Sequence, residues 1–303
     1  MPLTGTVVAQ GAGDTNVGGA QFHVDVPRRG GSGAMKSDDA HPVAAPMALP
    51  LPPMGWMSWL RFLCNTDCAA HPKACINADL YRSTADALVA GGFADAGYVG
   101  VHIDDCWAAK QRDPVSKQML PDPKRFPGRS GSGIKILGEY LASRNLSLGL
   151  YSDQGVKTCG GFPGSVGYED VDAVTFRSWG VRYLKLDGCN PLRNVSDTPY
   201  PCCEGMACRA EYATGYAAMG SALQRSGAGA PIAYACSWPA YLGDNEDTKP
   251  YEAIVAAGCN VWRSWTDTTC DWSRQLFILD HLGNYSKTFA RIAGPNHWND
   301  PDM

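Results

Sequence analysis

The chain has 303 residues, of which 45% are hydrophobic, and its 26 basic residues nearly balance its 30 acidic ones. A chain of this length can bury one large core, and no apolar stretch approaches the about 18 residues that a membrane span requires. The near balance of charge, without a basic stripe, argues against nucleic acid as a partner.

The first 48 residues differ in composition from the remainder. Residues 1–48 are rich in Gly, Ala and Pro, and they contain no apolar core of about 7–15 residues like that of a signal peptide. A segment of this composition buries too little apolar surface to fold, so we predict a disordered low-complexity segment. The folded domain is expected at residues 49–303.

From residue 49 onward, strand-like and helix-like patterns alternate. The predicted strands are 54–59, 98–105, 146–153, 181–187, 232–238, 261–267 and 291–296. The predicted helices between them are 78–90, 134–143, 171–179, 210–225, 251–257 and 272–281. This alternation predicts an α/β fold with a parallel sheet. We favour a (β/α)8 barrel, which typically needs about 250 residues. A doubly wound sheet is the alternative, but no glycine-rich phosphate loop follows an early strand.

Two of the predicted strands end at a carboxylate. Asp187 ends the strand 181–187, and Asp267 ends the strand 261–267. In a barrel the carboxyl ends of the strands share one rim, where the chemistry takes place. Two carboxylates at one rim suit glycoside hydrolysis, in which one attacks or stabilises the sugar carbon and the other handles the proton of the leaving group. The alternative is a structural role, which is common for a buried Asp beside a Gly.

The chain contains 12 cysteines, which indicate an oxidising compartment. A zinc site is an alternative interpretation of the cluster formed by Cys64, Cys68, His71 and Cys75, but no second cluster of paired ligands follows at finger spacing. Three N-glycosylation acceptor triplets add weight to a secretory protein, and they begin at Asn145, Asn194 and Asn284.

Five short blocks, in order along the chain, identify a family resemblance. They are PPMGW at 52–56, IDDCW at 103–107, KTCGGFPGS at 157–165, LKLDGC at 184–189 and WNDPDM at 298–303. From about residue 49 to residue 303 the sequence resembles the melibiase family of retaining exo-glycosidases, which contains α-galactosidases and α-N-acetylgalactosaminidases. The resemblance implies a barrel fold and no metal or other cofactor.

The resemblance also implies roles for individual residues. Asp187 matches the nucleophile that forms a covalent glycosyl-enzyme, and Asp267 matches the acid/base. For a retaining enzyme we expect their carboxyl groups about 5–5.5 Å apart. The positions that match the sugar-binding pocket are Trp59, Asp104, Asp105, Tyr151, Cys159, Lys185, Ser237, Ala240, Tyr241, Arg263, Asp302 and Met303.

Within that pocket, Asp104 and Asp105 match acceptors for sugar hydroxyls and Lys185 matches a donor to them. Trp59 and Tyr151 match apolar walls. Arg263 matches the group that holds the substituent on the second sugar carbon, and Asp302 and Met303 match residues that close the pocket. Adjacent carboxylates such as Asp104 and Asp105 are also compatible with a metal site, which the resemblance does not support.

Four disulfides follow from the same resemblance. They join Cys64 to Cys106, Cys68 to Cys75, Cys159 to Cys189 and Cys236 to Cys259. Four cysteines fall outside this pattern, namely Cys202, Cys203, Cys208 and Cys270. The first three lie in or near an apparent insertion at 190–206, where they are free to bridge one another.

The sugar preference depends on Ser237 and Ala240. Animal α-galactosidases place Glu and Leu at these positions, whereas α-N-acetylgalactosaminidases place Ser and Ala. Two small side chains leave room for an acetamido group, so we favour an α-N-acetylgalactosaminidase. An α-galactosidase is the alternative, in which the two small residues reflect variation between lineages.

Relatives continue past the position of Met303 with an eighth strand, its helix and a β-sandwich, so the resemblance implies a C-terminally truncated barrel. A rival hypothesis is an inactive or merely glycan-binding fragment. An α-glucan hydrolase is disfavoured, because Asp104, Asp105 and Lys185 match recognition of an axial 4-hydroxyl.

The expected substrates are oligosaccharides, glycolipids or glycoprotein glycans with terminal α-galactose or α-N-acetylgalactosamine. The expected location is the secretory pathway, a lysosome or vacuole, or the extracellular space. A homodimer is an assembly compatible with these expectations.

Overall fold

A computed structural model describes residues 49–191 and 206–302. Four expectations fall outside these residues: the disordered segment 1–48, the glycosylation triplet at Asn194, the pocket residue Met303, and the partners of Cys202 and Cys203. The side chain of Cys208 also lies outside the description. Within the described residues, no helix is long and apolar enough to cross a membrane.

The core of the fold is one seven-stranded sheet in the order β1-β2-β3-β4-β5-β6-β7. All six neighbouring pairs are parallel. The strands are β1 (Gly55–Met57), β2 (Gly100–Ile103), β3 (Ser147–Asp153), β4 (Val181–Asp187), β5 (Ala233–Cys236), β6 (Val261–Arg263) and β7 (Trp298–Asp300). Strand order that follows chain order, with helical crossovers, is that of a (β/α)8 barrel, and the described residues supply seven of its strands. In this part of the chain, β1 and β7 are the two edges of the sheet.

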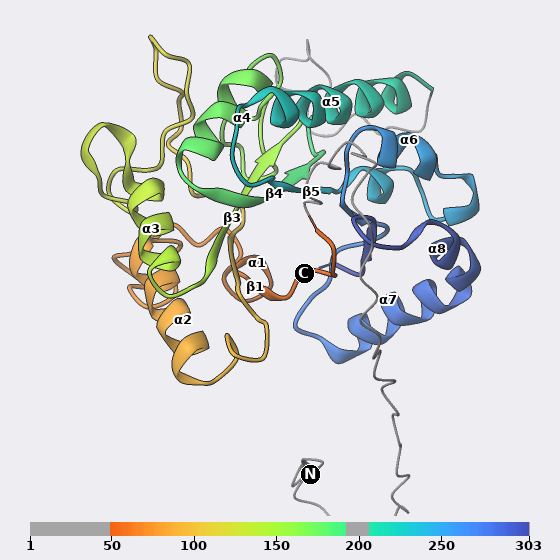
Figure 1. Cartoon of the computed structure of the whole chain (residues 1–303), viewed down its shortest axis with the longest axis horizontal. Helices are drawn as coiled ribbons and strands as arrows, with labels where there is room; N and C mark the ends of the chain where they lie inside the picture. The colour runs from red at the N-terminus through yellow and green to blue at the C-terminus, as the bar shows by residue number, and fades with distance from the viewer. Residues whose placement is uncertain (1–48, 192–205, 303) are drawn as a thin grey trace, which may run out of the picture. The chain divides into compact units, whose positions relative to one another are not determined.

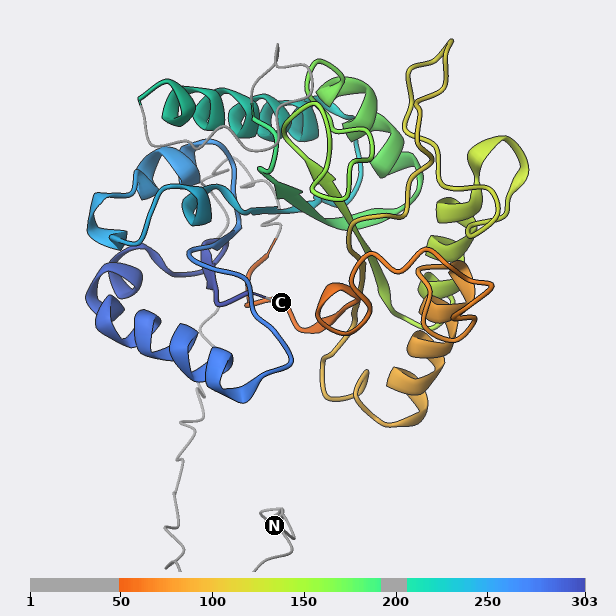
Figure 2. The same cartoon turned by 180° about the vertical axis from the view of Figure 1, so that it is seen from behind.

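Except for the short α1 (Trp59–Phe62), which lies near the middle beside β1, the helices line the outer side of the curved sheet (Figure 1), and the opposite view shows the same arrangement from behind (Figure 2). The other helices are α2 (Ala78–Ala90), α3 (Gly133–Ala142), α4 (Glu169–Ser178), α5 (Met206–Arg225), α6 (Tyr251–Ala256), α7 (Trp272–Asn284) and α8 (Ser286–Ile292). Three short 3-10 helices are η1 (Arg129–Gly131), η2 (Trp238–Tyr241) and η3 (Glu246–Thr248). Side-chain caps begin two of the longer helices: Asn77 accepts from Leu80 N, and Asp271 accepts from Ser273 N.

The predicted seventh strand, 291–296, is wrong. Residues up to Ile292 belong to α8, which buries Phe289 against Tyr251 with ring centroids 6.2 Å apart. The strand comes later, at β7, where Trp298 N donates to Asn260 O at 2.8 Å. The apolar residues near 291 therefore serve one face of a helix rather than a strand. Helices α1 and α8 were not predicted, whereas the other six strands and six helices overlap their expected positions.

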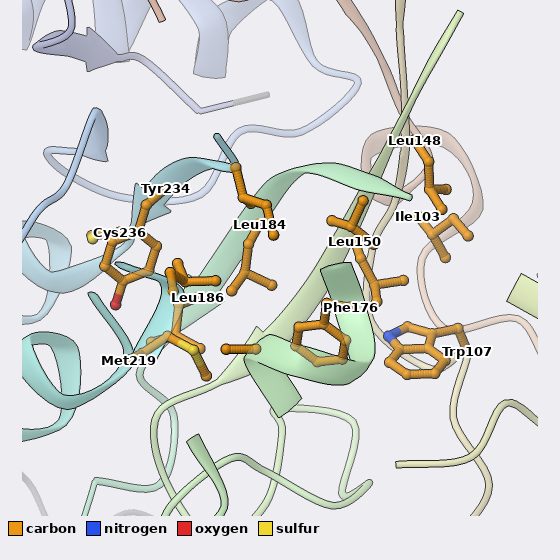
Figure 3. Packing of buried hydrophobic residues seen from close by; sticks show 14 of the residues in the cluster. Ile103, Trp107, Leu148, Leu150, Phe176, Leu184, Leu186, Met219, Tyr234 and Cys236 are labelled. Atoms are coloured by element: carbon orange, nitrogen blue, oxygen red, sulfur yellow. The ribbon is translucent and has the colours of Figure 1, made fainter. Parts of the chain in front are cut away.

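The main apolar core lies between the sheet and the helices. Figure 3 shows Leu184 and Leu186 of β4 among the buried side chains of this core. Phe176 of α4 and Met219 of α5 belong to the same cluster. Because side chains alternate along a strand, this packing leaves the intervening residues of β4 for the inner side of the curved sheet.

The four expected disulfides are present in the structure: Cys64–Cys106, Cys68–Cys75, Cys159–Cys189 and Cys236–Cys259. The interpretation of residues 64–75 as a zinc site is wrong, because Cys64, Cys68 and Cys75 form disulfides and so offer no thiolate to a metal. Cys270 is exposed and is free among the described cysteines.

Replacing Cys159 and Cys189 together by Ser is expected to lower the free energy of unfolding by about 3 kcal/mol, since the bond closes a loop with a sequence separation of 30. Denaturant unfolding would measure the change, with Cys270→Ser as a control that alters little.

Peptide mapping without reduction should find Cys159 joined to Cys189. Two free thiols at these positions in exported protein would contradict the pairing.

Candidate active site

Strand alternation carries three β4 side chains to the inner side of the sheet. Tyr183 belongs to a separate inner cluster with residues of β5 and β6. Lys185 and Asp187 follow at intervals of two, so they continue the same face toward the carboxyl end of the strand. Asp187 is the last residue of β4 and pairs in register with Asp153, the last residue of β3.

The carboxylate of Asp187 is held by three hydrogen-bond donors. Tyr241 Oη donates to Oδ1 at 2.6 Å, Tyr151 Oη donates to Oδ2 at 3.0 Å, and Gly188 N donates to Oδ1 at 3.0 Å. The sulfur of Cys159 lies 3.4 Å from Oδ2. Burial favours the protonated form, but Arg263 and Lys185 outweigh it and lower the pKa of Asp187 below its usual value. Asp187 is therefore a buried, ionised and firmly oriented carboxylate.

Arg263 connects Asp187 with the second expected catalytic residue. It ends β6, and its Nη2 lies 3.8 Å from Asp187 Oδ1. Its Nη1 lies 2.5 Å from Asp267 Oδ1. Asp267 itself lies beyond the end of β6 rather than within a strand, and 65% of its side chain is exposed. The two carboxylates therefore share one guanidinium but differ sharply in access to water.

Lys185 and Asp104 form a buried ion pair beside this cluster. Lys185 Nζ lies 2.8 Å from Asp104 Oδ2, and both side chains are largely buried. Burial lowers the pKa of Lys185, but Asp104 and Asp187 outweigh it, so the net pKa is raised. Asp105 has a different environment, because its oxygens accept from Cys106 N at 2.6 Å and Gly160 N at 2.7 Å. Burial raises the pKa of Asp105 to about 6.

The residues expected to set the sugar preference lie at the 3-10 helix η2: Ser237 immediately precedes it and Ala240 lies within it. Ser237 is buried and its N donates to Leu186 O at 3.0 Å, which fixes it beside the end of β4. Ala240 is half-buried. Tyr241 stacks on Tyr212 with ring centroids 5.3 Å apart. A small cavity has Lys185, Ser237, Arg263 and Asp302 in its lining.

Two expected pocket residues lie at the margins of the arrangement. Asp302 is buried, with Oδ1 3.7 Å from Arg263 Nε, and its Oδ2 accepts from Thr268 N at 2.7 Å. Trp59 begins α1 and is half-buried. Among the described side-chain contacts, none joins Trp59 to Asp187 or Asp267, so its role as a pocket wall stays a prediction.

Asp153 lies beside Asp187 but is absent from the expected site residues. This buried residue accepts from Gly155 N at 2.7 Å and from Cys189 N at 2.9 Å. Burial and the nearby Asp187 raise its pKa well above the usual value. The signal was available, because strand 146–153 ends at an acid just as 181–187 does. Asp153 lies near Cys159 and Cys189, but their disulfide leaves no thiolate for a metal.

Comparison with known proteins gives consistent relatives. The profile of a melibiase family described as alpha galactosidase A matches residues 51–303. Alpha-galactosidase A of Homo sapiens is 42% identical over 254 residues, covering 83% of this chain and 53% of the relative. Alpha-N-acetylgalactosaminidase of Gallus gallus is 42% identical over 253 residues, covering 83% and 56%. The crystal structure of alpha-galactosidase I from Mortierella vinacea matches with a TM-score of 0.63 and 30% identity, covering 85% of this chain and 59% of that one. The chain thus spans about half the length of the curated relatives it matches.

Asp302 yields a prediction about pH. Burial raises its pKa to about 7, whereas the pKa of an Asp in the unfolded chain is about 4. Between these values the folded state keeps a proton that the unfolded state has lost, so this group makes stability fall as the pH rises. Asp302→Asn removes that contribution.

Between pH 4.5 and pH 7.5 the free energy of unfolding should fall less in the variant than in the wild type. The difference between the two decreases should be about 1 kcal/mol or more. Urea unfolding at both pH values measures the difference. Identical pH dependence in the two proteins would show that Asp302 is ionised in the native state throughout this range.

Proposed function

Because the chain belongs to the melibiase family of glycoside hydrolases, we propose that it is a retaining exo-glycosidase that hydrolyses terminal α-linked galactose-type sugars. The observation that carries the proposal is the pair of carboxylates on Arg263, one buried and ionised and the other largely exposed. Two carboxyl groups flanking a sugar are the catalytic unit of such enzymes.

In the first step, Asp187 attacks the anomeric carbon and forms a covalent glycosyl ester while the bond to the leaving oxygen breaks. Protonated Asp267 gives its proton to that oxygen. The donors from Tyr151, Tyr241 and Gly188 fix the orientation of the Asp187 carboxylate, so that it can face the sugar. The exposure of Asp267 suits a group that must reach both the leaving group and water.

In the second step, Asp267 is anionic and removes a proton from water, whose oxygen attacks the anomeric carbon and releases Asp187. The two inversions retain the original configuration. Arg263 suits this cycle because one negative charge beside it persists throughout. The charge is on Asp187 before attack and on Asp267 while Asp187 is esterified.

The pair of Lys185 and Asp104 supplies a donor and an acceptor for neighbouring sugar hydroxyls. Asp105 is expected to accept from a sugar hydroxyl, and its contacts support a second role in holding a neighbouring loop. Its bond with Gly160 N holds the loop of Cys159 close to Asp187.

For the sugar itself we propose α-linked N-acetylgalactosamine, with α-galactose as the alternative. Ser237 and Ala240 are small, and Ser237 is fixed beside β4, so they are suited to admit an acetamido group. The substrates are then oligosaccharides, glycolipids or glycoprotein glycans that end in this sugar. The four disulfides support action in an oxidising compartment of the secretory pathway, in a lysosome or vacuole, or outside the cell.

Replacing the two carboxylates separates their roles. Asp187→Asn is expected to abolish hydrolysis and preserve the fold, because an amide cannot act as the covalent nucleophile. Asp267→Asn should lose at least about 100-fold on ordinary glycosides but less on substrates whose leaving groups need no proton. Release of chromogenic groups from α-galactosides and α-N-acetylgalactosaminides measures both. Wild-type rates in either variant would refute the assignment, and a wild type that binds these sugars without hydrolysis would support a glycan-binding protein.

The double change Ser237→Glu with Ala240→Leu tests the sugar preference. The added bulk should occupy the acetamido space, while the new carboxylate can accept from a 2-hydroxyl. Pocket size alone contributes roughly 1–3 kcal/mol, so the ratio of kcat/KM values for the two sugars should move toward galactose by at least about tenfold. A wild type that already prefers α-galactose would contradict the proposed preference.

A further inference from the structure

Asp267 has an exposed side chain, so its position depends on the backbone that carries it. Residues 264–267 connect Arg263 to Asp267, and this segment is anchored from several sides. Lys249 Nζ donates to Ser264 O at 2.6 Å. Arg274 Nε donates to Asp267 O at 2.9 Å. We call residues 264–267 the β6 exit loop.

The aromatic side chain of the β6 exit loop is also fixed. Trp265 stacks on His281 of α7, with ring centroids 3.8 Å apart and an interplanar angle of 10°. Its Nε1 donates to Asp244 Oδ1 at 2.8 Å. Phe277 covers it further, with ring centroids 4.7 Å apart.

One buried carboxylate links these anchors. Glu246 of η3 has no exposed surface. Its Oε1 accepts from Lys249 Nζ at 2.7 Å and from His281 Nε2 at 2.7 Å. Its Oε2 accepts from Tyr251 Oη of α6. Each of these two partners of Glu246 also contacts the exit loop: Lys249 contacts Ser264, and His281 contacts Trp265.

Glu246, Lys249 and His281 are buried. Lys249 and His281 both bond to Glu246, Lys249 also bonds to Ser264 O, and His281 stacks on Trp265. Their polar groups are thus occupied within the network, and none of them is placed to meet the sugar. Ion pairs in such surroundings are often replaceable by apolar residues without loss of stability. Fully satisfied polar networks do, however, hold groups in one geometry. Here the geometry that they hold is that of the loop ending in Asp267.

We propose that Glu246, Lys249 and His281 are positioning residues for Asp267, which fix the β6 exit loop so that the acid/base faces the leaving oxygen. This inference rests on the proposed function of Asp267. It predicts that loss of the network impairs proton transfer to the leaving group and leaves attack by Asp187 nearly unchanged.

The test compares substrates of one sugar with different leaving groups. Lys249→Met removes the donor to Ser264 O, and Glu246→Gln is a milder variant of the same shape. Arg112→Met is the matched control, because Arg112 is a largely buried cation that pairs with the buried Asp172 at 2.6 Å, and its partners among the described residues lie outside the exit loop. Each protein is assayed on a dinitrophenyl and an alkyl α-glycoside of the sugar that the wild type prefers.

In Lys249→Met, kcat/KM for the alkyl glycoside should fall by about 10–100-fold, and that for the dinitrophenyl glycoside by less than about threefold. Glu246→Gln should shift the same ratio in the same direction. Azide should accelerate the dinitrophenyl reaction of these variants and yield a glycosyl azide, since azide needs no general base. Arg112→Met should change both substrates equally and show no azide response. Equal losses on both substrates in Lys249→Met and Glu246→Gln, without azide rescue, would overturn the proposal.

Hydrogen exchange separates this inference from the proposed function. Amides of residues 264–268 should exchange at least about tenfold faster in Lys249→Met than in the wild type or in Arg112→Met. Unchanged exchange would overturn the anchoring by Lys249. A wild type that hydrolyses none of the glycosides would instead refute the proposed function and with it the role in proton transfer, while the exchange result would still decide whether the network holds the loop.

Discussion

The arrangement at the carboxyl ends of the strands depends on the buried guanidinium of Arg263. Three carboxylates converge on it, with Asp187 at 3.8 Å, Asp267 at 2.5 Å and Asp302 at 3.7 Å. Burial and the repulsion between neighbouring carboxylates would otherwise favour the protonated forms of the two buried members, Asp187 and Asp302. Arg263, with Lys185, reverses this tendency at Asp187 and leaves Asp302 with a raised pKa of about 7. A single cation thus allows Asp187, the proposed nucleophile, to be ionised while the neighbouring Asp302 retains its proton more readily.

The fold provides the convergence through simple repetition. Parallel strands in chain order bring their carboxyl ends to one rim, and alternation along β4 places Lys185 and Asp187 on the inner side. The disulfide Cys159–Cys189 joins the loops after β3 and β4, and Gly160 is held by Asp105. The side chain of Asp187, the proposed nucleophile, is therefore fixed by several independent restraints. The exit loop of β6 depends more on the buried network of Glu246.

Sequence patterns predicted the elements whose signals are local. The strands β3 and β4, which end at Asp153 and Asp187, are the longest of the described strands, at seven residues each. The prediction of a strand at 291–296 was wrong, because over six residues the sequence pattern of an apolar helix face resembles that of a short edge strand. No sequence pattern indicates the network of Glu246, because Lys249 follows η3, Tyr251 begins α6 and His281 comes from the more distant α7, so the three meet Glu246 only in the folded chain. Asp187 and Asp267 were singled out by position, whereas the pocket residues depended on the family resemblance.

The central claim is that Asp187 forms a covalent bond to the sugar. In a 2-deoxy-2-fluoro galactosyl reagent the fluorine slows both steps, and a good leaving group restores the rate of the first, so the covalent intermediate should accumulate. Peptide mapping by mass spectrometry is expected to find one sugar on Asp187, and proton NMR of the normal reaction should show the α-anomer as the first product. A label on another residue, or the β-anomer as the first product, would contradict the account.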